Sequence, residues 1–253
     1  MASVPETTIV RSWVVAKFAA TTLFSLKPAS STSSGGKSLL APTPFALKMA
    51  LLDAALRTLG RREGEVLFPA IRDLRIAVHL PIGAIVNNTF IKILRPHKEG
   101  AKDVNGTGLM TLMGNTIAFR EFVNFGEVMG LAISSSISAL DDQSLARLLL
   151  QINYLGKRGG FIQWQSLPEK QEWSDEALRQ NGYVVITESS QMFDSRGLLQ
   201  MMDDCGPTMT FAHANIYSDK SIKLGKERIL HHVVLPYRLM RSSKSYSYYE
   251  RID

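Results

Sequence analysis

The chain has 253 residues, of which 45% are hydrophobic, and this length can bury a sizeable core as one large domain or two small ones. Its formal net charge of +6 is compatible with a polyanionic partner, but a basic protein with no such partner is an equal alternative. The single cysteine, Cys205, excludes an internal disulfide framework and a multi-cysteine zinc site, and it fits a reducing cytoplasm.

The most apolar N-terminal stretch, 13–26, contains Lys17 and is shorter than the ~20 residues that a membrane-spanning helix needs. Acidic Glu6 precedes this stretch and Lys27-Pro28 follows it, which is unlike a secretory signal peptide. We therefore expect a soluble, cytoplasmic protein.

The first part of the chain predicts a strand, a loop and a helix. β-Branched and aromatic residues at 9–18 favour a strand, and the polar run at 30–38 favours a loop. Thr43 followed by Pro44 predicts a helix start, because threonine can cap the first turn and proline is favoured at its first position. Lys48 lies off the expected buried stripe of this helix. That stripe, with spacings of three and four residues, is Phe45, Met49, Leu52, Leu56 and Leu59.

Strands dominate the middle of the chain. The expected elements are a helix at 64–74, strands at 75–80, 87–95, 116–122 and 127–133, and a polar loop at 96–108. The strand at 87–95 is expected to project from the body of the protein. The strands at 116–122 and 127–133 are expected to pair with each other as a hairpin around Asn124, Phe125 and Gly126.

A second clear helix is predicted to begin at Asp141 and Asp142. A basic loop at 154–160 and a strand at 161–164 follow, and the acidic stretch 169–176 is interpreted as part of a surface insertion at 166–207. Further short strands are expected at 183–187, 209–214, 229–235 and 246–249. This order of elements predicts an α+β fold with a mostly antiparallel sheet, of the ferredoxin-like split βαβ kind.

The sequence lacks the usual catalytic and metal-binding patterns. Gly36-Lys37-Ser38 is not a phosphate-binding P-loop, because Ser31 stands where that motif needs glycine. His231 and His232 are adjacent, so on a strand they face opposite sides and cannot chelate one ion together. Adjacent carboxylates such as Asp203-Asp204 are typical of a cap or loop and not of an acid/base pair. We expect no catalytic residue, no metal site and no cofactor.

Cations beside glycine, hydroxyl or aromatic residues are the candidate RNA-binding residues. They are Lys37, Ser38, Arg95, His97, Lys98, Arg120, Lys157, Arg158, Arg241 and Lys244. Glycines around Lys157 and Arg158 let the backbone approach an anion closely, and an arginine near an aromatic ring can bind a phosphate and stack on a base. The alternatives are a solvated linker at 30–38, a salt bridge between Arg120 and Glu121 or a facing strand, and incidental charge in the other segments.

Together these segments resemble the Cas-five subunits of type I CRISPR effector (Cascade) complexes, members of the RAMP superfamily. The resemblance rests on the N-terminal strand and on four later stretches that occur in the family's order, 41–56, 119–122, 154–160 and 235–238. It implies one RAMP domain over 1–253, with a ferredoxin-like, RRM-type core and a projecting β-hairpin thumb at 82–127.

The resemblance also implies a function. Such subunits grip the 5′ handle of the crRNA and cap the backbone filament next to the large subunit. The implied partners are crRNA, a Cas-seven type backbone subunit, a large Cas-eight type subunit and, through the complex, target DNA in antiviral defence. One branch of the family cleaves precursor crRNA, so a metal-independent endoribonuclease is the alternative, with His97, His213 or Tyr154 as its base. A third possibility is a basic RNA-binding protein outside CRISPR systems.

Overall fold

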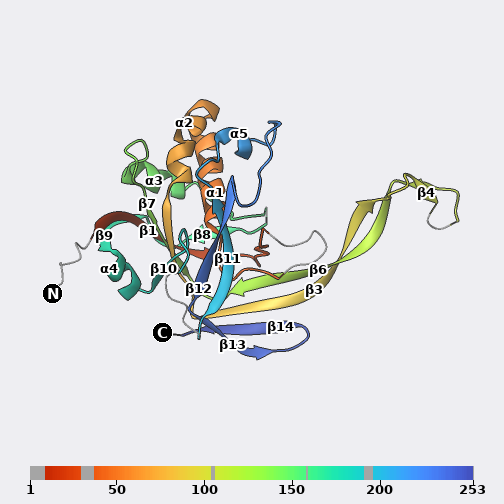
Figure 1. Ribbon diagram of the computed structural model, residues 1–253. Coiled ribbons are helices and arrows are strands. Elements are labelled where there is room, and N and C mark those ends of the chain that lie inside the picture. Colours follow the sequence, from red (N-terminus) through yellow and green to blue (C-terminus); the bar gives the residue numbers. More distant parts are fainter. Residues whose placement is uncertain (1–8, 30–36, 104–105, 158, 191–195, 253) are drawn as a thin grey trace.

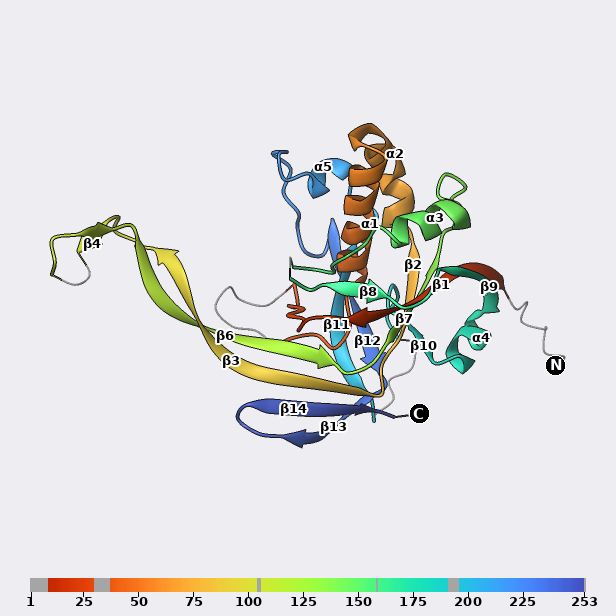
Figure 2. The same cartoon turned by 180° about the vertical axis from the view of Figure 1, so that it is seen from behind.

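The computed structural model describes residues 9–29, 37–103, 106–157, 159–190 and 196–252, and the statements below concern these residues. Its body is an antiparallel sheet with helices packed on it, and a long two-stranded hairpin projects far from that body (Figures 1 and 2). The expected α+β class and antiparallel sheets are confirmed.

The main sheet contains strands β1 (Val10–Ala20), β2 (Arg75–His79), β7 (Met129–Ser134), β8 (Ile162–Trp164), β9 (Glu169–Ser174) and β10 (Tyr183–Val185). The strand order is β10-β2-β7-β1-β8, and β9 also pairs with β1. Every pair in this sheet is antiparallel. Strand β7 is buried along its whole length between β1 and β2, which explains its uninterrupted apolar sequence.

The helices are α1 (Pro44–Thr58), α2 (Arg61–Arg72), α3 (Asp142–Leu149), α4 (Asp175–Gln180) and α5 (Phe211–Ala214). The alternation of strand β1 separates two clusters of buried side chains on the two faces of the sheet. Val14 and Phe18 belong to the main core, which includes the buried residues of α1, α2 and α3. Trp13 belongs to a second cluster with Leu178 of α4.

A four-stranded sheet, ordered β13-β14-β3-β6, carries the projecting hairpin. Its strands are β3 (Gly83–Pro96), β6 (Met113–Phe125), β13 (Tyr237–Ser242) and β14 (Tyr246–Arg251), and β4 (Lys102–Asp103) pairs with β5 (Met110–Thr111) near the hairpin tip. Val86 and Val123 are buried where the hairpin leaves the body, whereas Phe90 and Ile117 are exposed further out. Strands β11 (Leu198–Cys205) and β12 (Arg228–Leu235) form a separate ribbon.

The first helix begins as predicted, but its buried face differs from the prediction. The Thr43 hydroxyl accepts a hydrogen bond from the Ala46 N–H at 3.2 Å, and Pro44 is the first helical residue. Leu59, in contrast, is 48% exposed. The residues that are in fact buried are Pro44, Leu47, Lys48, Ala50, Leu51, Leu52, Ala54 and Ala55. Because most residues of this helix are apolar, spacing alone did not determine which side faces the sheet.

Three segments take a structure other than the expected one. Strand β6 pairs with β3 over its whole length and β7 pairs with β1 and β2, so 116–122 and 127–133 are not a hairpin. The segment 166–207, expected to be a surface insertion, supplies β9 and β10 to the main sheet. The acidic residues of β9 are compatible with a strand because β9 lies at an edge of the sheet, where charged side chains are tolerated. Segment 209–214 contains helix α5 and not a strand.

Candidate functional site: a cationic pocket at the start of helix α1

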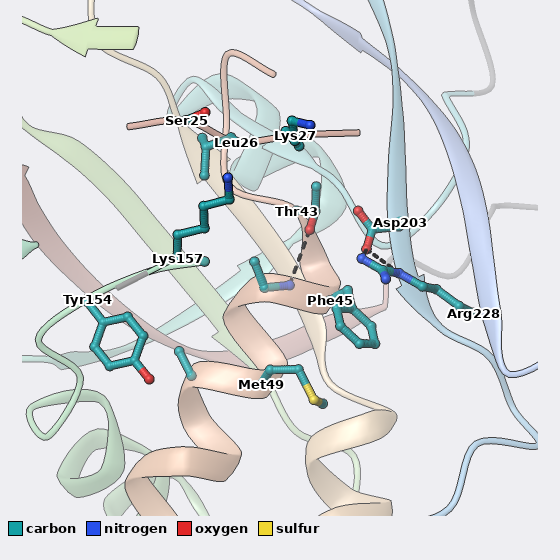
Figure 3. Close-up of a pocket in the computed structure, with 13 residues that line it drawn as sticks. Ser25, Leu26, Lys27, Thr43, Phe45, Met49, Tyr154, Lys157, Asp203 and Arg228 are labelled. Carbon is teal, nitrogen blue, oxygen red and sulfur yellow. Dashed lines mark hydrogen bonds and ion pairs between the residues drawn. The ribbon is translucent and has the colours of Figure 1, made fainter. Parts of the chain in front are cut away.

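A pocket of about 280 Å³ opens beside the first turn of α1. Its walls come from the segment after β1, the start of α1, the loop before β8 and the β11–β12 ribbon. Figure 3 shows Lys27 and Lys157 on one side, with the Lys157 ammonium directed toward the segment that carries Ser25 and Leu26. Arg228 lies on the opposite side, next to Phe45.

Backbone pairing brings three cations together beside this pocket. The N–H groups of Phe24 and Val123 each donate to the other residue's carbonyl, at 2.9 and 2.6 Å, so the segment after β1 runs antiparallel along β6. Lys27 follows Phe24 by three residues and lies near enough to Arg120 and Lys157 for their charges to act on its ammonium group. Lys157 reaches the same place from the loop before β8. The expected loop 154–160 and strand β6 therefore converge, although Arg120 and Lys157 are far apart in the sequence.

Burial lowers the pKa of both lysines, and neighbouring positive charge adds to the effect. Desolvation lowers the pKa of Lys27 below its ordinary value, and the charges of Arg120 and Lys157 lower it further. Lys157 is exposed as a residue, but partial desolvation of its ammonium lowers its pKa, and Arg120 adds to the effect. Ammonium and guanidinium groups form strong, charge-assisted hydrogen bonds with phosphate, so this arrangement favours the binding of phosphate groups.

The first turn of α1 adds to the positive potential. The first turn contains no acidic residue, and Thr43 and Ala46 both line the pocket. Unpaired amide groups and the helix dipole place partial positive charge at the beginning of a helix, where anions are favoured. The pocket therefore has side-chain cations and a helix N-terminus on adjacent walls.

The opposite wall is largely apolar. The Arg228 Nε donates to Asp203 Oδ2 at 2.7 Å, so an ion pair neutralises its charge. Its guanidinium lies 4.0 Å from the centre of the Phe45 ring, and Met49 lies beside Phe45 on the same helix. A flat guanidinium and aromatic surface, neutralised by Asp203 and facing a cluster of lysines, suits a nucleotide, whose base can stack while its phosphate is paired.

Histidines and metal-binding clusters are absent from the described lining of the pocket. Among the described residues, no histidine lines the pocket, and no cluster of three or more His, Cys, Asp or Glu could hold a metal ion. His213 accepts the Thr210 N–H at 3.1 Å, where it caps α5. Of the expected bases, only Tyr154 lies at the pocket.

Four of the predicted RNA-binding residues belong to described segments near this pocket. Arg120 and Lys157 are part of the cation cluster, and Lys37 is exposed on the preceding loop. Ser38 is buried: its hydroxyl accepts the Leu26 N–H at 3.0 Å, and its N–H donates to Glu121 at 2.5 Å. Ser38 thus holds the Lys27 segment against β6. Arg158 lies outside the described residues.

The other five predicted residues lie on the strands or turns of the four-stranded sheet β13-β14-β3-β6, away from the pocket. Arg95, His97 and Lys98 are at the outer end of the hairpin, and Arg95 is about 20 Å from Arg120 along the strands, at ~3.3 Å per residue. His97 packs against Gly114, where an added Cβ would come within 2.4 Å of its ring. Arg241 and Lys244 are exposed on the β13–β14 hairpin. The structure therefore does not bring all ten residues into one site.

Several residues at or beneath the pocket were missed by sequence reasoning. Lys27 was assessed only as an argument against a signal peptide, and Arg228 was not singled out. Asp203 and Asp204 lie on strand β11 and are buried in ion pairs, which corrects the expectation of a cap or loop. Lys48, expected off the buried stripe of α1, is the partner of Asp204 at 2.7 Å.

Comparison with known proteins identifies the chain's relatives. No family model matches the sequence. The CRISPR-associated protein Cas5 of Archaeoglobus fulgidus is 26% identical over 212 residues, which cover 83% of this chain and 86% of that protein. The chain is a Cas5 homologue. The resemblance to the Cas-five family, expected from the sequence, is confirmed.

Two solved structures are also similar to this Cas5 homologue. A chain of a CRISPR RNA-guided surveillance complex matches with a TM-score of 0.49 and 13% identity, over 88% of this chain and 90% of that one. A CRISPR protein from Archaeoglobus fulgidus matches with a TM-score of 0.44 and 13% identity, over 96% and 92% of the two chains. In the described residues, no helix of this homologue combines the length and apolar character needed to cross a bilayer.

Proposed function

We propose that this Cas5 homologue is a non-catalytic crRNA-binding subunit of a CRISPR RNA-guided complex, and that it grips the 5′ handle of the crRNA at the pocket beside α1. The observation that carries this proposal is the convergence of Lys27, Arg120 and Lys157 beside the first turn of α1. A phosphate bound there meets these cations and the positive end of the helix, so the anion stabilises the folded pocket.

The strand order and the projecting hairpin support this proposal. The order β2-β7-β1-β8, with α1 and α2 between β1 and β2 and α3 between β7 and β8, supports assigning a ferredoxin-like split βαβ core. On this assignment the β3–β6 hairpin is the thumb, and Arg95, His97 and Lys98 contact RNA or a neighbour near its tip. The subunit would pack against a Cas-seven type backbone subunit and a large Cas-eight type subunit, and target DNA would bind through the complex.

The composition of the pocket favours binding over cleavage. A metal-independent ribonuclease needs a base for the 2′-hydroxyl and a cation for the leaving oxygen. Tyr154 and Lys157 both line the pocket, so they are the pair to test for this alternative. With no histidine among the lining residues, we propose that the handle is held and left uncut.

The test is binding of labelled repeat-derived handle RNA to the purified protein in EDTA, over a range of salt concentrations. Replacing Lys27 and Lys157 together with Met keeps the side-chain stems and removes two charges. We expect weaker binding and a salt dependence shallower by about 1.4, at ~0.7 per phosphate contact for a single strand. The matched control replaces Arg147 and Arg179, two exposed helical arginines, with Met and should bind like the unchanged protein.

Two outcomes would reject the proposal. Equal loss of affinity in the two double variants would mean that net charge, and not the pocket, binds the RNA. Specific cleavage of the repeat RNA that disappears in Tyr154→Phe or Lys157→Met would make the protein the endoribonuclease.

A further inference from the structure

A second cationic and aromatic surface lies on the loop that joins α5 to β12, residues 215–227, called here the α5–β12 loop. Ile216 is 86% exposed and Tyr217 is 91% exposed, so two adjacent apolar side chains contact the body of the protein very little. Single exposed apolar residues are common on protein surfaces, but a neighbouring pair this open is a candidate contact site.

Local hydrogen bonds hold this loop in one shape. The side-chain oxygen of Asn215 accepts the Tyr217 N–H at 3.1 Å, and its carbonyl accepts the Ser218 N–H at 3.0 Å. The Ser218 hydroxyl then accepts the Lys220 N–H at 3.1 Å. Because the backbone is already ordered, Tyr217 is presented to solvent without a large loss of entropy when it binds a partner.

Three lysines follow Tyr217 at intervals of three residues. Lys220, Lys223 and Lys226 are all exposed. Within the α5–β12 loop, which the structure describes completely, Asp219 is the one exposed acidic residue. Glu227 is buried and accepts the Lys223 N–H at 3.0 Å, and it lies at the limit of an ion pair with Lys226, at 3.9 Å. The outer surface of the loop is therefore strongly positive.

This loop is separate from the pocket beside α1. None of the residues 215–227 lines that pocket, although Arg228, the next residue, does. The Gly206 N–H donates to the Glu227 carbonyl at 2.8 Å and anchors the end of the loop. Figures 1 and 2 show the loop on the side of the molecule toward which the β3–β6 hairpin projects. The loop can therefore bind a second ligand while a polyanion occupies the pocket.

We propose that the α5–β12 loop is a second binding site, for single-stranded nucleic acid, in which Tyr217 stacks on an unpaired base and Lys220 and Lys223 bind adjacent phosphates. An exposed aromatic side chain with cations around it is the arrangement that binds single strands without sequence preference. The chemistry suits either DNA or RNA, so the two are separated by experiment. An anionic membrane is a weaker fit, because one aliphatic and one aromatic side chain give little apolar area to insert.

The experiment uses the full chain with its pocket saturated by unlabelled handle RNA, and measures the binding of fluorescent dT20 and, separately, rU20. Tyr217→Ala should weaken binding at least about fivefold with an unchanged salt slope, and Tyr217→Phe should restore it, because stacking needs the ring and not the hydroxyl. Lys220→Ala with Lys223→Ala should make the salt dependence shallower by about 1.4.

Controls separate this site from folding, net charge and the pocket. These side chains are exposed, so all variants should melt like the unchanged protein, and the Arg147→Met/Arg179→Met control should keep its affinity for both oligonucleotides. The Lys27→Met/Lys157→Met variant should bind dT20 or rU20 normally, even where it loses handle RNA. Loss of binding to one oligonucleotide alone would support the proposal and identify the natural strand.

Three results would overturn the proposal. One is equal binding of both oligonucleotides by Tyr217→Ala and by the unchanged protein. Another is that the loop variants lose only handle RNA, which would assign the loop to the pocket. The third is that they bind both oligonucleotides normally but lose phosphatidylserine vesicles, which would make the loop a membrane contact.

Discussion

Replacing Lys48 with Met should destabilise the protein strongly, because it removes one member of a buried ion pair. Lys48 and Asp204 are 2.7 Å apart, with side chains only 2% and 5% exposed. At an effective dielectric constant of ~20 the attraction between the charges is about 6 kcal/mol, and the cost of desolvating both offsets most of it. Met keeps the length of the lysine stem, so the change tests charge and not packing.

The expected loss is about 3–4 kcal/mol, near the lower end of the ~3–5 kcal/mol found when one partner of a buried pair is removed. The lower end applies because the Asp204 carboxylate still accepts a hydrogen bond from the Cys205 N–H at 2.7 Å, and His231 Nε2 lies 3.5 Å from its other oxygen. For a chain of this size the melting temperature should fall by about 6–16 °C.

Cys205 supplies the assay. It is the single cysteine of the chain, it is buried, and burial raises its pKa to about 12, so a thiol reagent reacts with it only after the structure opens. Lys48→Met should speed this labelling roughly 100- to 1,000-fold, since each ~1.4 kcal/mol is a factor of ten.

Two further variants decide whether the reasoning is correct. Asp53→Ala removes a largely exposed pair with Arg57 on the same helix, whose atoms are 2.9 Å apart, and should cost about 0.5 kcal/mol. Lys48→Met combined with Asp204→Asn should recover most of the stability, because no unpaired charge remains and the amide oxygen still accepts the Cys205 N–H. If Lys48→Met is as mild as Asp53→Ala, or if the double variant does not recover, the ion-pair account is refuted.

Three other substitutions have expected outcomes from the structure. Gly206→Ala should cost at least about 2 kcal/mol in chemical denaturation, because the added Cβ would lie 1.9 Å from the Lys226 carbonyl oxygen, whereas Gly126→Ala meets no atom within 4 Å and should be nearly neutral. Lys157→Met should make the RNA-free protein slightly more stable at pH 7, because the lowered pKa of Lys157 marks a charged form that folding disfavours. That gain should shrink as pH rises toward the ordinary lysine value of 10.5, where the unchanged protein also loses the charge; a variant less stable at pH 7 would contradict this account.

Local signals in the sequence predicted the features that depend on neighbouring residues. Thr43 and Pro44 identified the start of α1, and Asp141, whose carboxylate accepts the Ser144 N–H at 2.7 Å, identified the start of α3. Caps depend on residues within one helical turn, so the sequence contains all the information they need.

Features that depend on distant pairings could not be predicted in the same way. Lys27 reaches Arg120 only because Phe24 pairs with Val123, and a single sequence does not reveal that register. The burial of Lys48 depends on Asp204, a residue whose strand was itself interpreted as part of a surface insertion. Arg120 and Lys157 were therefore predicted as separate RNA-binding residues, but the sequence did not show that they lie close together in one site.

The position of the β3–β6 hairpin in the chain has a consequence for how this protein can vary. The hairpin leaves the body between β2 and β7, two strands that are neighbours in the main sheet, with His79 opposite Gly130. Of the described residues in 89–120, Ala118 alone is buried, so the outer hairpin contributes little to the core. Loop-closure entropy rises only as the logarithm of length, by about 0.6 kcal/mol per doubling. Insertions and deletions between residues 89 and 117 should therefore cost the fold little, and the length of the hairpin can evolve independently of the body that holds it.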